Sequence, residues 1–264
     1  MDPTADDDRE RAGAGKRRVV NIVSATVTWF GDPANWSGPN GIPARLLEHV
    51  EISAVTLVIA LVLALPLGLW IGHTDRGARL AVAAANFGRA VPTLAVMGIV
   101  APFTTLIDPG LGFIVYPTVV AMVLLAVPPI LVNAYAGVHD VDRDLVEAAR
   151  GIGYRERQIL LGIELPIALP VVSGGIRSAS VQVIATATLG ALFGFGGLGR
   201  FLKDGIDSNV TGETWGGVVL VALLVLTSEG VFALVQRRLL SHGLRTGGPV
   251  ALREPAQFPG AGMR

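Results

Sequence analysis

Two stretches of this chain, residues 52–72 and 113–138, are strongly apolar and contain no charged residue. A helix rises about 1.5 Å per residue, so about 20 apolar residues cross the roughly 30 Å hydrocarbon core of a bilayer. Both stretches reach that length. A helix that is apolar on every side belongs either in the core of a large protein or in a membrane. We therefore expect both stretches to be transmembrane helices.

Three more stretches have the length of a membrane span and hold one ionisable residue each. They are residues 81–107 with Arg89, residues 166–195 with Arg177 and residues 215–235 with Glu229. Charged residues make up 16% of the chain and hydrophobic residues 51%, whereas about 25% of an ordinary soluble domain is charged. The sequence therefore predicts an all-α integral membrane bundle of five core transmembrane helices, surrounded by membrane lipid and without a nucleic-acid partner.

The predicted spans divide the chain into three parts. Residues 1–45 form an N-terminal tail with a short helix, residues 46–240 form the membrane domain, and residues 241–264, rich in Gly and Pro, are expected to be a disordered tail. In the first part, apolar residues at helical spacing over 19–30 predict an amphipathic helix lying in the membrane interface. A strained sixth crossing is the alternative, although twelve helical residues extend only about 18 Å.

Basic residues in the loops predict the orientation, because cytoplasmic loops are enriched in Lys and Arg. One side and the C-terminal tail hold Arg76, Arg79, Arg143, Arg150, Arg155, Arg157, Arg237 and Arg238. The loops on the other side hold only Arg200 and Lys203. The central loop and the C-terminus are therefore expected in the cytoplasm. Five spans then place the N-terminus outside, although the five basic residues within 1–18 favour the cytoplasm by the same rule.

The loop between the third and fourth predicted spans carries a charged segment that contains glycine. Asp144 followed by Glu147 resembles a capping box, so a helix is expected to begin there. Its expected apolar face consists of Leu145, Ala148, Ala149 and Ile152. Gly153 suits the end of a helix, and a second amphiphilic segment, 154–163, leads to Pro166 in the first turn of the next span. The pattern predicts a helix, a turn and a second helix on the cytoplasmic surface.

The small side chains of Ala148 and Ala149 indicate a function for this surface helix. They would let its backbone lie deep in a groove of another protein. The polar rim of such a contact would consist of Arg150, Arg155, Glu156 and Arg157. A solvated connector between two spans is the alternative.

The spacing of this segment resembles the cytoplasmic coupling motif of permease subunits in binding-protein-dependent ABC importers of the type I fold. That motif reads Glu-Ala-Ala, three residues, Gly, nine residues, Ile, one residue, Leu-Pro. The matching residues here are Glu147, Ala148, Ala149, Gly153, Ile163, Leu165 and Pro166. The resemblance implies that these residues, with Arg150 and Gly151, couple the bundle to a cytoplasmic ATPase subunit. It also implies an extracytoplasmic solute-binding protein and a second permease, either another copy or a paralogue.

Other stretches resemble, more narrowly, the permeases that import compatible solutes: glycine betaine, choline, carnitine or proline. They are residues 46–50, 85–86, 91–95, 141–142, 175–179, 186–189 and 194–199. The resemblance covers residues 46–235, and Arg89 departs from the neutral amide expected in this group. A permease for methionine or another amino acid shares the coupling motif and is the alternative.

Four residues in the predicted spans are candidates for the lining of a translocation path: Arg89, Pro92, Arg177 and Glu229. A charge inside a membrane span is costly and usually faces a cavity or a partner charge. The ionisable residues therefore either line the path or pair between spans. Alternatively, they lie close enough to the span ends to extend towards the polar interface.

The sequence favours transport over catalysis. The 4 histidines fall at span ends or in loops, neither an HExxH nor a GxSxG pattern occurs, and the chain has no cysteine. We expect no catalytic residue, metal site or cofactor in this chain, and we expect ATP hydrolysis on the partner subunit. A membrane scaffold that binds a cytoplasmic partner without moving solute is the remaining alternative.

Overall fold

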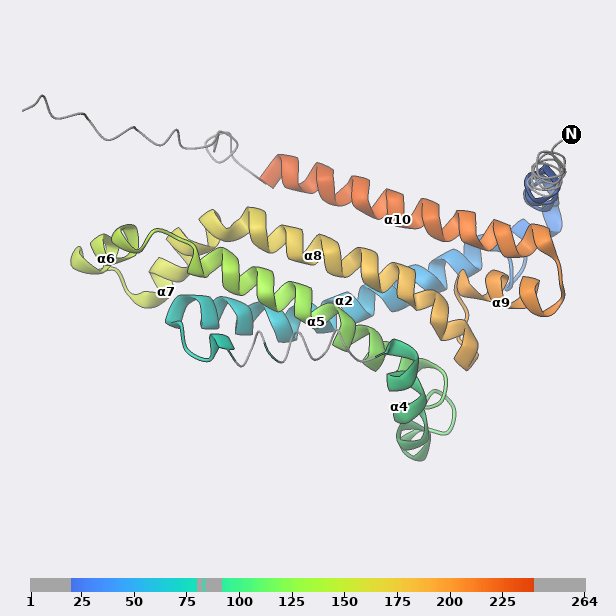
Figure 1. Ribbon diagram of the computed structural model, residues 1–264, viewed down its shortest axis with the longest axis horizontal. Helices are drawn as coiled ribbons and strands as arrows, with labels where there is room; N and C mark the ends of the chain where they lie inside the picture. The colour runs from blue at the N-terminus through green and yellow to red at the C-terminus, as the bar shows by residue number, and fades with distance from the viewer. Residues whose placement is uncertain (1–19, 80–82, 84–91, 240–264) are drawn as a thin grey trace, which may run out of the picture.

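The computed structural model describes residues 20–79, 83 and 92–239, and every regular element within them is a helix. Four long helices form an elongated bundle (Figure 1): α2 (Ile42–Thr74), α5 (Val115–His139), α8 (Leu165–Ala187) and α10 (Thr211–Leu239). Each is long and apolar enough to cross a bilayer, α8 as part of a continuous helical segment, Glu156–Phe193. The expected all-α membrane bundle is confirmed.

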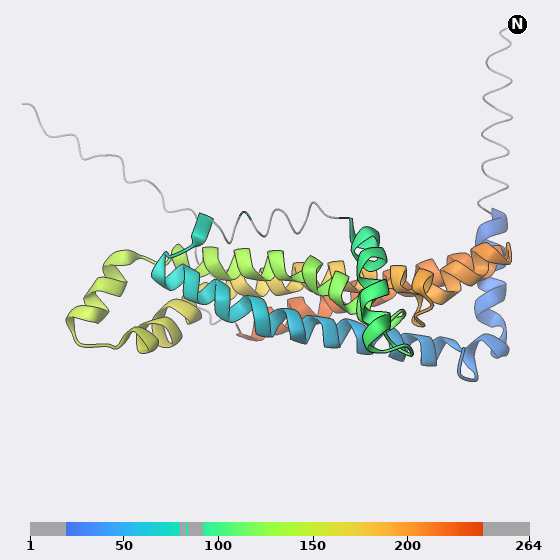
Figure 2. The same cartoon turned by 90° about the horizontal axis from the view of Figure 1, so that it is seen from below.

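Shorter elements occupy the two ends of the bundle. One end, which we call the α6 end, carries α6 (Arg143–Gly151) and α7 (Glu156–Ile159). The opposite end, the α9 end, carries the helix Val20–Gly31, the 3-10 helix η1 (Pro33–Trp36) and α9 (Gly199–Asp207) (Figures 1 and 2). The remaining elements are α4 (Thr93–Ile107), which packs on α5, the π-helix η2 (Leu160–Glu164) and the 3-10 helix η3 (Thr188–Phe193).

The predicted spans agree with the long helices to different degrees. Spans 113–138 and 215–235 closely match α5 and α10. Span 52–72 is only the later part of α2, because the helix begins earlier, at Ile42, with polar turns that include Arg45 and Glu48. The first half of span 81–107 and the tail 241–264 lie outside the described residues, and α4 is the second half of that span.

Small residues bring α2 and α5 into close contact. On the packed face of α2 they recur at every fourth position: Ala60, Ala64, Gly68 and Gly72. A Cβ atom at Gly68 would lie 2.7 Å from the Cβ of Ala134, and one at Gly72 would lie 2.8 Å from the Cβ of Val138. Helices in lipid associate through such close backbone packing, because burial away from lipid brings little hydrophobic gain.

The helix Val20–Gly31 runs across the α9 end, and not along the bundle, in both views (Figures 1 and 2). Trp29 packs edge-on against Phe201 of α9, with ring centroids 5.2 Å apart, and it leaves no room for a side chain at Gly216 of α10. The opposite side of the helix exposes Val20, Val23 and Val27. This placement favours the interfacial helix over a sixth crossing.

Candidate functional site

The N-cap of α6 lies two residues before the predicted one. The carboxylate of Asp142 accepts a hydrogen bond of 2.9 Å from the amide of Asp144. The prediction that Asp144 and Glu147 begin the helix as a capping pair is therefore wrong. Asp142 takes this position because its backbone is outside the helical region, with ψ at 120°, so its side chain reaches the free amides of the first turn.

α6 ends at Gly151 with Ile152 as its C-cap, and Gly153 follows as the left-handed residue that terminates the helix, as predicted. Gly153 has a φ of 92°, and its amide donates to the carbonyl of Arg150, while the amide of Tyr154 donates to the carbonyl of Ala149. This pair of hydrogen bonds is a Schellman motif, which satisfies the last carbonyls of a helix and reverses the chain. Residues 143–159, which we call the α6–α7 hairpin, fold back on themselves at this point.

The inward face of α6 is formed by Val146 and Ala149, which are 1% and 5% exposed. They pack with Val141 and Ile159, and Ile163 borders the same cluster. The predicted apolar face is therefore wrong at Ala149, which lies inside the hairpin and is not available to a partner. The hairpin needs this small core, because an isolated helix of 9 residues is marginal in water.

The outward face of α6 combines exposed apolar side chains with small residues. Leu145 and Ile152 are 43% and 77% exposed, and Ala148 between them is exposed as well. These positions follow i, i+3 and i+7 and form one stripe along the helix. Gly151 borders the stripe, and a Cβ atom there would meet no atom of the described chain within 4 Å. An uncovered apolar stripe on a protruding hairpin is typical of a docking surface.

Arg150 and Glu156 link the two helices of the hairpin. Nε and Nη2 of Arg150 donate to the two carboxylate oxygens of Glu156, at 2.8 and 2.9 Å. This hydrogen-bonded carboxylate raises the pKa of the Arg150 guanidinium. Both side chains are about half exposed, so the pair fixes the geometry more than it adds stability. Glu147, the first residue of the motif, is also exposed.

Polar contacts continue from Glu156 to α2 through His73. Nε2 of His73 lies 3.0 Å from a carboxylate oxygen of Glu156, and Nδ1 lies 2.6 Å from Oε2 of Glu164. Glu164 is fully buried, and its Oε1 has no hydrogen-bond partner among the described residues. The motif itself does not specify His73 or Glu164. The only signal in the sequence is that Glu164 is a lone carboxylate within the apolar run 159–172.

The last residues of the motif lie where the hairpin joins the bundle. Leu165 packs against a cluster that includes Val138 and Val172, and Pro166 is exposed in the first turn of α8. Because Pro166 has no amide hydrogen, the carbonyl of Gly162 lacks its α-helical donor, and the helix takes the π form just before this proline. The motif therefore divides between an outward face and an inward connection to α8.

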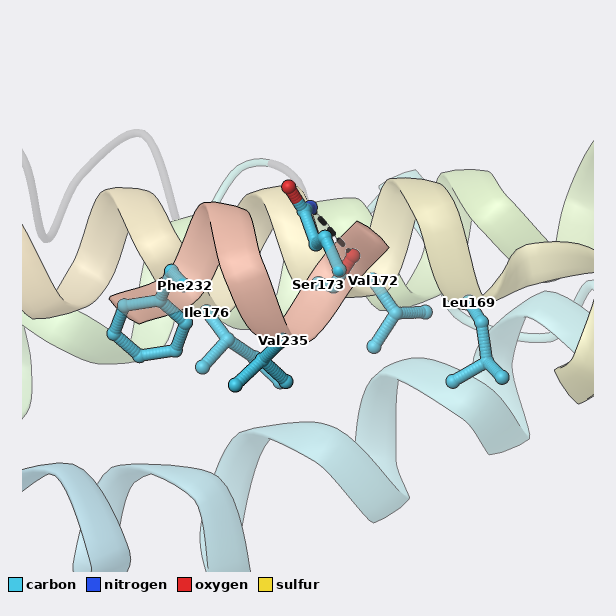
Figure 3. Close-up of a pocket in the computed structure, with 7 residues that line it drawn as sticks. Leu169, Val172, Ser173, Ile176, Phe232 and Val235 are labelled. Atoms are coloured by element: carbon cyan, nitrogen blue, oxygen red, sulfur yellow. Dashed lines mark hydrogen bonds between the residues drawn. The ribbon is translucent and has the colours of Figure 1, made fainter. Parts of the chain in front are cut away.

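An ion pair and a hydrogen bond join α8 to α10. Nε of Arg177 donates to the carboxylate of Glu229 at 2.6 Å. Nearer the α6 end, the side-chain amide of Gln236 donates to the hydroxyl of Ser173 at 2.7 Å (Figure 3). A cavity of about 160 Å³ lies beside this hydrogen bond and is lined by Leu169, Val172, Ile176, Phe232 and Val235. The structure thus pairs two of the predicted path residues between spans.

The other predicted path residues are not part of this pair. Pro92 is the exposed N-cap residue of α4, and Arg89 lies outside the described residues. The side chains of Arg177 and Glu229 are 39% and 30% exposed, so the pair is partly exposed at the surface of the described chain. Within the part of the chain that the structure describes, no three His, Asp or Glu side chains are grouped to hold a metal ion.

Known proteins are similar to this chain over most of its length. Residues 64–245 match the family described as the binding-protein-dependent transport system inner membrane component. The choline transport system permease protein OpuBB of Bacillus subtilis is 31% identical over 201 residues, which cover 76% of this chain and 89% of that protein. The carnitine transport permease protein OpuCB of Listeria monocytogenes is 30% identical over 223 residues, which cover 84% and 97%.

The arrangement of the helices also has a close counterpart among solved structures. A chain of the MetNI methionine ABC transporter in an inward-facing conformation aligns with a TM-score of 0.65 and 23% identity, over 73% of this chain and 93% of that chain. At this identity the likeness supports the fold alone.

Proposed function

Because this chain belongs to the family of binding-protein-dependent transport system inner membrane components, we propose that it is the permease subunit of an ATP-driven importer of compatible solutes. The two relatives, at 31% and 30% identity, are named for the transport of choline and carnitine, which both carry a quaternary ammonium group. We extend the proposed solute class to glycine betaine, which shares that group, and to proline. The chain is the membrane component and not an enzyme, so ATP hydrolysis belongs to a separate subunit.

The outward face of α6 carries this proposal. Leu145, Ala148 and Ile152 form an apolar stripe at the tip of the molecule, on a hairpin with its own small core. A rigid hairpin that exposes apolar side chains is suited to enter a groove and to transmit force. We propose that the ATPase subunit receives this face, with Glu147, Arg150 and Gly151 at its border and Ile163, Leu165 and Pro166 connecting it to α8.

We place the α6 end, together with the C-terminus, in the cytoplasm. Arg76, Arg143, Arg150, Arg155 and Arg157 lie at or next to this end, and the last turn of α10, which runs towards it, adds Arg237 and Arg238 (Figure 1). Among the described residues, the α9 end has fewer basic side chains, and this asymmetry favours a cytoplasmic α6 end. The α9 end then faces the solute-binding protein, and the helix Val20–Gly31 lies in the interface on the extracytoplasmic side of the membrane.

We propose that Arg177 and Glu229 line the translocation path in an assembly of two permease subunits. The pair is polar, joins two helices that are long and apolar enough to cross a membrane, and is partly exposed. A charge pair in a span satisfies each member while keeping polar atoms available to a passing zwitterion. Arg89 and Pro92 stay predicted members of this path from their position in the sequence.

Reconstitution tests the proposed function. Proteoliposomes that contain this permease, its ATPase and its solute-binding protein are loaded with ATP, and uptake of labelled choline, carnitine and glycine betaine is measured. We expect saturable uptake that unlabelled quaternary ammonium solutes inhibit and methionine does not. Vesicles without the binding protein are the control. Uptake of methionine would assign the chain to amino-acid import, and docking of the ATPase without any uptake would support a scaffold.

A further inference from the structure

His73 connects three separate elements at the α6 end. It lies in the last turn of α2, Glu156 lies in the first turn of α7, and Glu164 is the last residue of η2. Its side chain is 9% exposed and touches both carboxylates, that of Glu164 at 2.6 Å. The backbone joins the hairpin to α5 and to α8, whereas α2 is connected to it only through space.

The chemistry of these contacts makes the link hard to break. Each ring nitrogen of His73 lies within hydrogen-bond distance of a carboxylate oxygen, Nε2 at 3.0 Å from Glu156 and Nδ1 at 2.6 Å from Glu164. One side chain therefore bridges both carboxylates. Glu164 is fully buried with Oε1 unpartnered, so separation from His73 would leave a buried carboxylate without any partner in the described chain.

Hydrogen bonds also hold the other end of α2 in place. His49 is fully buried, with Nε2 2.9 Å from the carbonyl of Ile184 and Nδ1 accepting from the amide of Leu198 at 3.3 Å. Glu48 accepts from the amide of Gly197 at 2.7 Å. The helix between His49 and His73 spans about 36 Å at 1.5 Å per residue. At the α9 end, α2 is therefore held by hydrogen bonds to α8 and to the glycine-containing turn after η3.

We propose that His73 is a positioning residue that makes the end of α2 move together with the α6–α7 hairpin. A displacement of the hairpin by a docked subunit then reaches α2 directly, in addition to reaching α8 through the backbone. This inference rests on the proposed function for the source of the motion. The contact of His73 with the hairpin lies within this chain alone, so its effect on the distance between α2 and the hairpin is measurable without any partner.

The first experiment measures the tie itself in the full chain. The protein has no cysteine, so spin labels at Trp70→Cys on α2 and Arg157→Cys on α7 report one distance without background. Both positions are exposed. With His73 intact we expect a narrow distance distribution in lipid nanodiscs, and in His73→Leu a broad one. Thr74→Ala is the matched control, because the Thr74 hydroxyl donates to the carbonyl of Trp70 at 2.8 Å and accepts from the amide of Arg76 at 3.4 Å, so its hydrogen bonds lie at the end of α2 and not on the hairpin. The carbonyl of Trp70 is kept in the labelled chain.

The second experiment measures the consequence in the reconstituted transporter. We expect His73→Leu to lower the number of solutes moved per ATP hydrolysed by about tenfold while ATPase binding persists. His73→Gln retains a donor for one carboxylate and should restore most of the coupling. Glu164→Gln keeps the shape of the side chain and provides a second variant if His73→Leu does not fold.

The outcomes separate the two proposals. An unchanged distance distribution in both His73→Leu and Glu164→Gln, or unchanged transport per ATP in a folded His73→Leu transporter, would overturn the positioning role. If the unmodified complex moved no solute, the proposed function would fail, and the label distances would still decide whether His73 ties α2 to the hairpin.

Discussion

Arg177 on α8 and Glu229 on α10 form an ion pair across the seam between the two helices, with Nε of the guanidinium 2.6 Å from the carboxylate. The hydrogen bond between Gln236 and Ser173 also joins these two helices, beside a cavity lined by apolar side chains. A charge at membrane depth needs a partner, so each residue of the pair explains why the other is tolerated in an apolar span.

Removal of one charge of this pair should destabilise the protein more than removal of both. Arg177→Ala leaves Glu229 unpaired in an apolar seam and should destabilise the protein by about 2–3 kcal/mol, the cost of one charge in a span. Arg177→Ala combined with Glu229→Ala should recover most of that loss. Thermal unfolding in detergent and in nanodiscs measures the relative stability of the original protein, the single variant and the double variant. A double variant less stable than both single variants contradicts a compensating pair.

The contact between α2 and α5 should be sensitive to the size of one residue. Gly68→Leu inserts a side chain where a Cβ atom already lies 2.7 Å from Ala134, and such overpacking costs about 1–3 kcal/mol. Gly230→Ala on α10 is the matched control, because a Cβ atom there meets nothing within 4 Å. Denaturation midpoints of the purified variants provide the measurement. Equal stability of Gly68→Leu and Gly230→Ala would show that α2 and α5 are not in close contact.

Two glycines of the hairpin should respond differently to alanine. Gly153 has a φ of 92°, so Gly153→Ala forces an alanine into the left-handed region at a cost of about 1–2 kcal/mol. Gly151 is helical with open space around it, so Gly151→Ala should leave the fold intact. If α6 enters a narrow groove, Gly151→Ala should still weaken binding of the ATPase subunit. Circular dichroism and a pull-down of the ATPase separate the two effects, and full binding by Gly151→Ala would argue against close approach at this residue.

The N-cap of α6 distinguishes the structure from the sequence-based prediction. Asp142→Ala removes the side chain that accepts from the amide of Asp144 and should cost about 1 kcal/mol. Asp144→Ala, at the position predicted from sequence, should cost clearly less. Differential scanning calorimetry of the two variants is the measurement. The reverse order would restore Asp144 as the start of the helix.

The sequence was most informative where a single physical requirement dominates. A span without charge has few alternatives in lipid, so 113–138 and 215–235 closely match α5 and α10. Gly153 was predictable because the left-handed conformation strongly favours glycine. The polar first turns of α2 are not constrained in this way. They are helical, but their charged residues set them apart from an uncharged span, so the predicted span begins too late.

The direction in which side chains point was less predictable. Ala148 and Ala149 are adjacent and chemically identical, and only the packing of Val146 and Ile159 decides that Ala149 is inside and Ala148 outside. A charge pair between spans was one of three open alternatives, and the partners Arg177 and Glu229 were not predicted, because helical spacing does not specify which spans are neighbours. His73 and Glu164 are 91 residues apart, so their contact depends entirely on the tertiary fold.

The most direct test of the account is crosslinking from single cysteines in this cysteine-free chain to the ATPase subunit of a transporting complex. Cysteine at Leu145 or Ile152, on the outward face of α6, should crosslink to that subunit, and the yield should change when ATP binds. Cysteine at Ala149, which is 5% exposed, should not crosslink in the folded complex. Absence of crosslinks from both Leu145 and Ile152 in a complex that transports solute would contradict the assignment of α6 as the ATPase docking surface.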